Sequence, residues 1–134
     1  MESRLKELAK YRFEKSGEDL EDAIMLLEKE RYRLALNRSY YSIFHGMRAV
    51  NTLDGFDSSK HSGVIAHFNQ FYVKEGKFPR ETYKLIRSAS EMREQADYED
   101  FFIVSKQEAE EQVRAAQKFY EEIKEFLINN QVLE

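Results

Sequence analysis

An arginine and a histidine lie seven residues apart in the segment RYRLALNRSYYSIFHGMRAV, residues 31–50. Seven residues make two helical turns, so Arg38 and His45 are expected to project from one face of a helix. A guanidinium offers phosphate oxygens a planar set of donors and keeps its charge. An imidazole titrates near neutral pH and can accept or donate a proton. The pair therefore predicts phosphodiester chemistry, with His45 and Arg38 as the catalytic residues.

Such a pair could cleave RNA without a metal ion. His45 would take the proton of the 2′-hydroxyl, and Arg38 would stabilise the negative charge that builds up on phosphorus. The leaving 5′-oxygen also needs a proton, and a two-fold dimer would bring a second histidine and a second arginine into one cleft. The same spacing is also typical of a solvated helix face or a buried polar pair.

Five neighbouring residues are candidates for binding the substrate. Tyr41 and Ser42 flank the Arg38 side of the helix, and Arg48 follows His45 by three residues. Lys60 and His61 stand at the expected start of the next helix, where they could assist phosphate binding. Basic residues interleaved with aromatic ones can hold single-stranded RNA by charge and stacking. A helix with one core face and one wet face has the same composition.

The sequence favours no metal or cofactor. There is no cysteine, and His61 and His67 are not expected to share a helix face. The residue three before each histidine is serine or valine, which excludes the Glu-x-x-His pairs of di-iron bundles. No glycine-rich phosphate loop is present. We interpret His67 as a surface residue.

Helical periodicity dominates the whole chain, and no segment alternates with a period of two. Gly17 is expected to bend or loosen the first helix, and Ser105 with Glu108 predicts a capping box. The loop 97–104 is expected to carry Tyr98, Phe101 and Phe102 back onto the core. The pattern predicts a single all-α domain over residues 1–134, an up-down bundle of four to five helices, over about 3–29, 32–53, 59–74, 79–95 and 105–130.

The second of these helices has two different sides. One is an ordinary apolar stripe of five residues, Leu36, Tyr40, Ile43, Met47 and Val50. The other side mixes Arg38 and His45 with apolar residues, Leu34, Tyr41 and Ala49. A helix of this kind usually lies between two packed partners, so we expect a homodimer formed partly on this side.

Charge is unevenly distributed along the 134 residues. The formal net charge is −4, but residues 29–90 carry +6 and the two flanks together −10. A local positive field attracts phosphates whatever the total charge. The chain has no apolar run of the roughly 20 residues that cross a membrane, and its first residues lack the apolar core of a signal peptide. We therefore expect a cytoplasmic protein without a membrane partner.

Four stretches of this sequence resemble the HEPN domain family, the "higher eukaryotes and prokaryotes nucleotide-binding" domains. They are ALNRSYYSIFHGMRAV, KHSGVIAHFNQFYVKEGKF, MREQADYE and AAQKFYEEI, in that order. The likeness runs from about Ser3 to Leu127 and is strongest to small, single-domain prokaryotic members.

The resemblance implies an all-α bundle that commonly forms homodimers. Many members are metal-independent ribonucleases with an arginine, four to six residues, and a histidine, which Arg38 and His45 match. Many are toxins paired with a minimal nucleotidyltransferase, and others bind nucleotides or are inactive. Ser39 stands where active members often have Asn, Asp or His, and Met47 where one toxin subgroup has a modified tyrosine. The hypotheses are thus a HEPN-type endoribonuclease toxin, a non-catalytic dimer that binds a nucleotide or a nucleotidyltransferase, and a plain helical interaction module.

Overall fold

The computed structural model describes residues 3–134 as helices joined by short loops. No strand occurs among these residues, so the predicted all-α class is confirmed. The third helix continues directly into a π-helical segment, η1 (Asn69–Val73). The five α-helices are α1 (Ser3–Glu28), α2 (Tyr32–Thr52), α3 (His61–Phe68), α4 (Arg80–Tyr98) and α5 (Lys106–Asn129).

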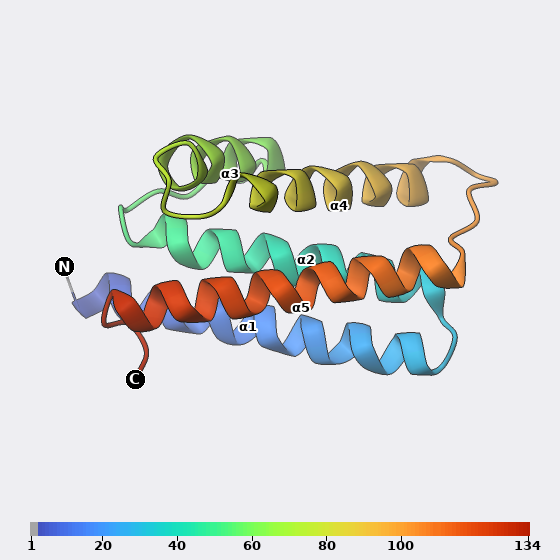
Figure 1. The fold of residues 1–134 in the computed structure, drawn as a ribbon, viewed down its shortest axis with the longest axis horizontal. Coiled ribbons are helices and arrows are strands. Elements are labelled where there is room, and N and C mark those ends of the chain that lie inside the picture. The colour runs from blue at the N-terminus through green and yellow to red at the C-terminus, as the bar shows by residue number, and fades with distance from the viewer. Residues whose placement is uncertain (1–2) are drawn as a thin grey trace.

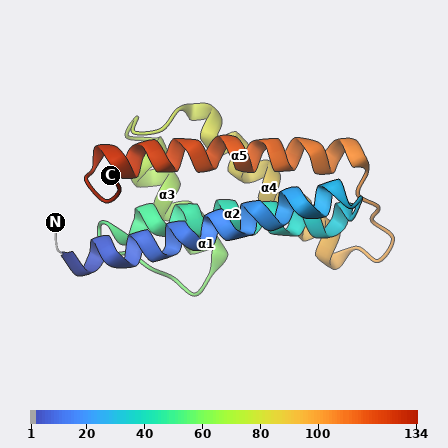
Figure 2. The ribbon, with the colours of Figure 1, turned by 90° about the horizontal axis from the view of Figure 1, so that it is seen from below.

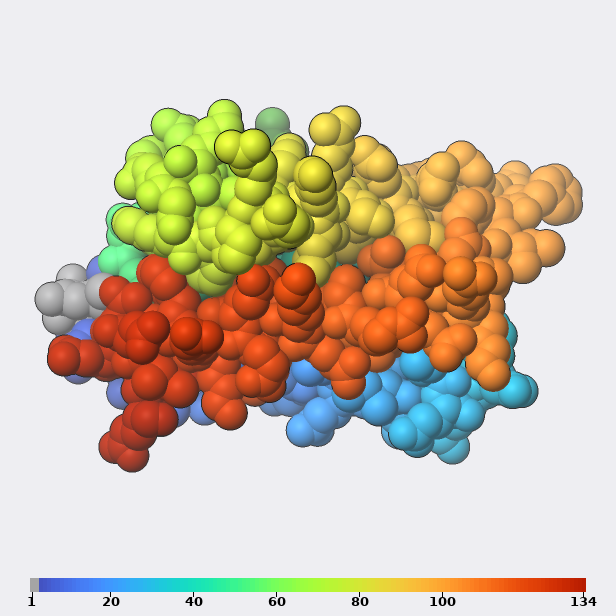
Figure 3. Space-filling view, viewed as in Figure 1, coloured from blue at the N-terminus to red at the C-terminus, as the bar shows by residue number. Residues whose placement is uncertain are grey.

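The helices form a bundle in which α2 is the central element. Helices α1, α2 and α5 run side by side along the long axis, and α3, η1 and α4 lie along the other side of α2 (Figure 1). Helix α2 packs against all four other α-helices. On the face seen in Figure 3, α5, α4 and the α3–η1 segment cover α2 almost completely.

The apolar stripe predicted on α2 forms the centre of the core. Ile43, Met47 and Val50 are completely buried, and Leu36 and Tyr40 are 1% exposed. Gly46 permits close packing here, because a Cβ atom at this position would stand 3.0 Å from the Phe119 ring of α5.

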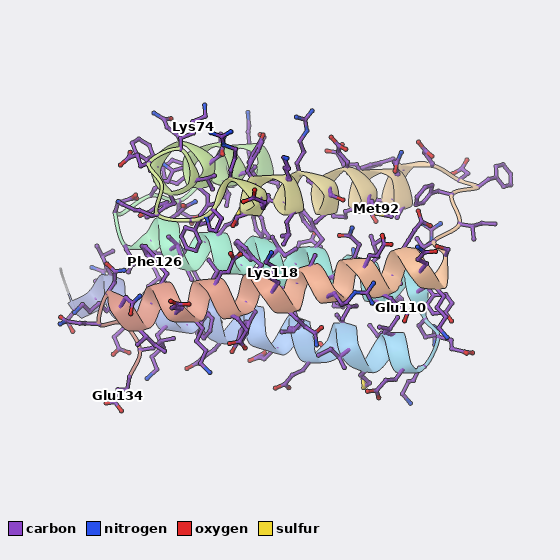
Figure 4. All side chains as sticks on the ribbon, viewed as in Figure 1. Lys74, Met92, Glu110, Lys118, Phe126 and Glu134 are labelled. Atoms are coloured by element: carbon purple, nitrogen blue, oxygen red, sulfur yellow. The ribbon has the colours of Figure 1, made fainter. Side chains whose placement is uncertain are left out.

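An aromatic cluster joins α5 to the α3–η1 layer. Phe126 extends from α5 towards that layer (Figure 4), with its ring 5.7 Å from Tyr72 and 5.0 Å from Phe78. The Phe68 ring lies 5.1 Å from Phe78 and 5.8 Å from Phe119. Offset and edge-on aromatic contacts of this kind stabilise a core beyond the area that they bury.

Local signals at the helix ends are partly confirmed. Ser105 and Glu108 form the predicted capping box at the start of α5. Gly76, with φ of 81°, lies in the turn after η1. Helix α1 runs without interruption through Gly17. The small residue lets Tyr120 approach, because a Cβ atom at this position would stand 3.2 Å from the Tyr120 hydroxyl.

The loop between α4 and α5 differs from its prediction. Tyr98 and Phe101 are 77% and 95% exposed and do not return to the core, whereas Phe102 packs against the small cluster around Leu36. The Arg33 guanidinium donates hydrogen bonds to the carbonyls of Ala96 and Phe102 and holds the loop in this position. Helix α4 also continues to Tyr98, beyond the predicted end at residue 95.

One side of the bundle carries two projecting loops. Figure 2 shows the α2–α3 loop and the α4–α5 loop extending beyond α1 and α2 on the side away from α5. None of the helices within residues 3–134 is long and apolar enough to cross a membrane.

Candidate functional site

Arg38 and His45 meet at one carboxylate of the neighbouring helix. Asp19 of α1 accepts a hydrogen bond from Arg38 Nη1 to its Oδ1 at 3.0 Å. His45 Nε2 lies 3.8 Å from the other oxygen, Oδ2. The two-turn spacing on α2 therefore places both side chains against the same point of α1.

The Arg38 guanidinium is held on a second side by its neighbour. Its Nε and Nη2 donate to the Asn37 Oδ1 at 3.1 and 2.8 Å. Its Cζ lies 4.9 Å from the centre of the Tyr41 ring, within the range of a cation–π contact. The side chain is still 36% exposed, so a phosphate could reach its outer edge.

The two nitrogens of His45 have different surroundings. Nδ1 is buried and has no hydrogen-bond partner, while Nε2 faces Asp19. Nε2 is therefore the nitrogen available for proton transfer. Burial, together with the positive charges of Arg48, Lys15, Arg38 and Arg12, lowers the pKa of His45 to about 4. The imidazole is neutral at pH 7, and the tautomer that carries its proton on Nδ1 can accept a proton at Nε2.

Asp19 does not reverse this effect on His45, although the two groups are close. The carboxylate is already paired with Arg38, and burial raises the pKa of Asp19 itself. The positive charge of Arg38 therefore largely cancels the effect of the Asp19 charge on the imidazole. The four cations around His45 outweigh this one acidic neighbour, so the surroundings favour an anion near the ring.

A pair of serines fixes the distance between α1 and α2 beside the site. Ser16 Oγ donates to the carbonyl oxygen of Ser42 at 2.6 Å, and Ser42 Oγ donates to the carbonyl oxygen of Ser16 at 2.9 Å. Both serines are 1% exposed. Ser42, which the sequence suggested for substrate binding, thus lies inside the helix interface, where it holds α1 at the depth that brings Asp19 to Arg38.

Arg48 belongs to a charge cluster with the α2–α3 loop. It donates from Nη2 and Nε to the two carboxylate oxygens of Asp57, at 3.1 and 3.3 Å. Arg12 of α1 binds the same carboxylate at 3.1 Å and Thr52 Oγ1 at 2.5 Å. Two guanidiniums thus share one carboxylate, which leaves an excess of positive charge next to His45.

His61 is the first residue of α3 and lies against the side of α2 that carries Tyr40 and Phe44. Its Nδ1 is 2.8 Å from the Tyr40 hydroxyl. Its ring packs 4.2 Å from Phe44 and 5.8 Å from Tyr41, both on α2. Lys60 is exposed and precedes α3, and within the described residues its side chain makes no hydrogen bond or ion pair.

His67 is not the free surface residue that the sequence suggested. Its Nε2 lies 2.9 Å from Asp54 Oδ2, and its ring stacks 3.8 Å from Phe56. The side chain is only 12% exposed. His67 therefore holds the α2–α3 loop against α3.

Arg93 and Asp97 form an ion pair one turn apart on α4, with 3.2 Å between Nη1 and Oδ2. Arg93 also lies over the Tyr40 ring, with its Cζ 4.7 Å from the centre. No group of three His, Asp or Glu side chains close enough to hold a metal ion occurs in residues 3–134.

Sequence reasoning missed Asp19, Tyr40 as a partner of His61, and the cations Arg12 and Lys15. An aspartate in an acidic, amphipathic helix gives no signal of its own. The sequence pattern assigns Tyr40 to the core, because its ring lies in the apolar stripe. Only its hydroxyl contacts the site, at His61. The serine pair Ser16 and Ser42 fixes the register that brings these groups together.

The expected dimer residues are only partly available on this chain. Leu34 is 45% exposed and Tyr41 is half-buried, but Ala49 is completely buried within the bundle. Ala49 therefore cannot contact a second copy.

Comparison with known proteins shows the family to which this chain belongs. The chain matches the HEPN domain family over residues 9–126 and belongs to that family. It is 34% identical over 113 residues to a UPF0332 protein of Thermotoga maritima, covering 84% of this chain and 86% of the relative. A Methanocaldococcus jannaschii protein named "Putative toxin" is 31% identical over 133 residues, 99% of this chain and 90% of the relative. A second protein of that organism with the same kind of name is 34% identical over 110 residues, 82% and 81% of the two chains.

Proposed function

We propose that this HEPN protein is a metal-independent endoribonuclease with Arg38 and His45 as its catalytic residues. The observation that carries the proposal is the joint environment of these two side chains. Both lie against Asp19, and the positive charges of Arg48, Lys15, Arg38 and Arg12 act on the His45 imidazole. A site that gathers positive charge around a neutral base is suited to an anionic substrate whose proton must be removed.

The reaction is an intramolecular transesterification, in which the 2′-oxygen replaces the 5′-oxygen of the next nucleotide on phosphorus. His45 Nε2 takes the proton of the 2′-hydroxyl, and the 2′-oxygen attacks the adjacent phosphorus. The bond to the 5′-oxygen breaks, and that oxygen leaves with a proton from an acid. Arg38 donates hydrogen bonds to the non-bridging oxygens as their charge increases. The products are a 2′,3′-cyclic phosphate and a 5′-hydroxyl.

Residues around the pair supply the contacts that RNA requires. Arg48 lies next to an aromatic ring, with its Cζ 5.9 Å from the centre of Phe44. Tyr41 presents its half-buried ring beside Arg38. Lys60 adds a free ammonium near the start of α3. Charge and base stacking together bind single strands with little preference for sequence.

We further propose that the active form is a homodimer built on the open side of α2, the side that carries Leu34, Arg38, Tyr41 and His45. Leu34 and Tyr41 supply apolar contact area there, and the two projecting loops border this side (Figure 2). A two-fold axis would bring two such sites into one cleft. Light scattering at micromolar concentration measures the assembly; a monomer would exclude this arrangement.

The names of the two Methanocaldococcus relatives support a biological role as a toxin. A toxin of this kind would need a neutralising partner, and a minimal nucleotidyltransferase is the partner that the family resemblance suggests. One observation favours the alternative of a non-catalytic member that binds a partner or a nucleotide. The α4–α5 loop exposes Phe101 and Ile103 at 95% and 84%, as interaction surfaces do.

The test is cleavage of a mixed RNA pool by purified protein in excess chelator. Wild-type protein should cut and leave 2′,3′-cyclic phosphate ends. His45→Gln should reduce the rate by about 10²- to 10⁴-fold, the usual contribution of an acid–base group. Arg114→Gln is the matched control, because Arg114 is exposed on α5.

Equal cleavage by His45→Gln and wild type would show that the site is assigned to the wrong residues. If the wild type cuts no RNA and is harmless when expressed, the non-catalytic alternative is the better one.

A further inference from the structure

The proposed reaction leaves one role unfilled, because the departing 5′-oxygen needs a proton donor. His45 cannot serve both steps at once within one turnover. A second copy of His45 across a dimer is one source of that proton. A second source lies in the same chain, on the other flank of the α2 surface that carries Arg48.

His45 and His61 stand on two sides of the same pair of aromatic residues. The Phe44 ring centre is 5.6 Å from His45 and 4.2 Å from His61. The Tyr41 ring centre is 6.3 Å from His45 and 5.8 Å from His61. Both imidazoles therefore border one short stretch of α2, although they come from different helices.

Arg48 is the cation that these two histidines share. Burial lowers the pKa of both imidazoles, and the Arg48 guanidinium lowers each of them further. It also lies over Phe44, which separates the two rings. A phosphate that displaced the Asp57 carboxylate from Arg48 would thus have one histidine towards α1 and the other towards α3. An in-line displacement on phosphorus needs a base and an acid on opposite sides of the phosphate.

Resting on the proposed ribonuclease function, we propose that His61 is the general acid of the same chain and donates its Nε2 proton to the leaving 5′-oxygen. His45 gains the proton of the 2′-hydroxyl, and His61 loses one to the 5′-oxygen as the phosphorus–oxygen bond breaks. Exchange with water then restores both. Each protomer would contain a complete acid–base pair.

Tyr40 positions this acid. Its hydroxyl engages His61 Nδ1 at 2.8 Å, which leaves Nε2 as the nitrogen for the substrate. Burial raises the pKa of Tyr40 to about 12, so the hydroxyl stays protonated. The negative charge of a bound phosphate favours the cationic form of His61, in which the Tyr40 hydroxyl oxygen accepts the Nδ1 proton.

The far side of His61 offers room for the leaving nucleoside. His61 lines a cavity of about 340 Å³ between α3 and α4, together with Tyr83, Arg87 and Arg93. This volume is in the lower part of the range for small-molecule sites, roughly 300–1,000 Å³. The Tyr83 ring is a suitable contact for a base. Glu91 and Glu94 also line this cavity, and Arg87 is paired with Glu91 at 3.0 Å, so the cavity offers no site for the next phosphate.

A substrate with a different leaving group distinguishes a general acid from a residue that only binds the substrate or packs in the fold. In one RNA oligonucleotide a single bridging 5′-oxygen is replaced by sulfur. A thiol has a pKa of about 8.5, whereas an alcohol is close to water at about 15.7, so the thiolate leaves without a proton. His61→Gln should slow the oxygen substrate by about 10²- to 10⁴-fold and leave the sulfur substrate near the wild-type rate. His45→Gln should slow both substrates.

Tyr40→Phe is a second variant with the same expected pattern and a smaller effect, because it removes only the hydroxyl that orients His61. Helix content and thermal unfolding of both variants are measured beside the kinetics. Equal slowing of both substrates by His61→Gln would overturn the assignment.

Mixing His45→Gln with His61→Gln chains tests whether both groups act from one protomer. No cleavage should return; restored cleavage would place the acid and base on different chains. A wild type that cleaves neither substrate would instead remove the proposed function, and this assignment with it.

Discussion

The apolar side of α2 and its open side place opposite demands on the same helix. On the apolar side, Ile43 and Met47 are completely buried, and Gly46 lets the Phe119 ring approach the backbone. On the open side, His45 Nδ1 is buried without a partner, and the positive charges of four cations act on the imidazole. The first side uses close packing to stabilise the fold.

The second side costs stability in two ways. A buried polar atom without a partner loses its hydrogen bonds to water and gains none. Like charges near one ring repel one another, and Asp19 and Asp57 compensate them only in part. Features that lower the stability of the fold and do not improve its packing are expected where function requires them. The contrast within α2 therefore supports the proposed site independently of the spacing of Arg38 and His45.

Substitution at Arg38 is the strongest way to sharpen this comparison. Arg38→Gln should reduce RNA cleavage by a factor similar to His45→Gln, on the order of 10²–10⁴. Arg38→Lys should recover only part of the rate, because lysine lacks the bidentate fork. The double variant should be little worse than the worse single one, since groups that act as a unit are not additive. Multiplied losses in the double variant would instead mean two independent roles.

On the apolar side the corresponding change is Gly46→Val, which should affect stability and not chemistry. The new side chain would meet the fully buried Phe119, where the first carbon alone stands at 3.0 Å. Overpacking of this kind typically costs about 1–3 kcal/mol in the free energy of unfolding. Urea denaturation measures it, and cleavage per folded molecule should stay unchanged.

Gly17→Ala is the control, because its neighbour Tyr120 is half-buried and can move. Equal losses at Gly17 and Gly46 would show that packing is no tighter on α2 than elsewhere.

The sequence predicts the apolar side of α2 better than the open side. Helical periodicity is a local property, so Ile43 and Met47 are assigned to the core correctly, and the Ser105–Glu108 box follows from residues three apart. The partner of Arg38 depends instead on how deeply α1 lies against α2. Asp19 is 19 residues away from Arg38 along the chain, and a buried serine pair sets that depth.

Tertiary contacts also explain the two errors at the surface. His67 is held by Asp54 from the preceding loop, which a helical pattern does not reveal. Phe101 was expected in the core because of its apolar side chain, but Arg33 fixes the loop through backbone carbonyls at Ala96 and Phe102. In both places a polar contact with another segment decides the position of an aromatic side chain.

The smallest expected effect is the pH dependence that His45 gives to folding. The pKa of His45 is about 4 in the folded protein and near its ordinary value of 6.5 in the unfolded chain, so the unfolded chain binds a proton first. The stability contributed by the neutral ring is complete above pH 6.5 and is lost as the pH falls towards 4. Wild type should therefore lose about 1–2 kcal/mol more than His45→Gln between pH 7 and 4.5. Urea denaturation of both proteins at each pH removes the shared contribution of the carboxylates. Parallel curves would mean that His45 titrates normally in the folded state, and that the open side of α2 carries no excess of positive charge at this ring.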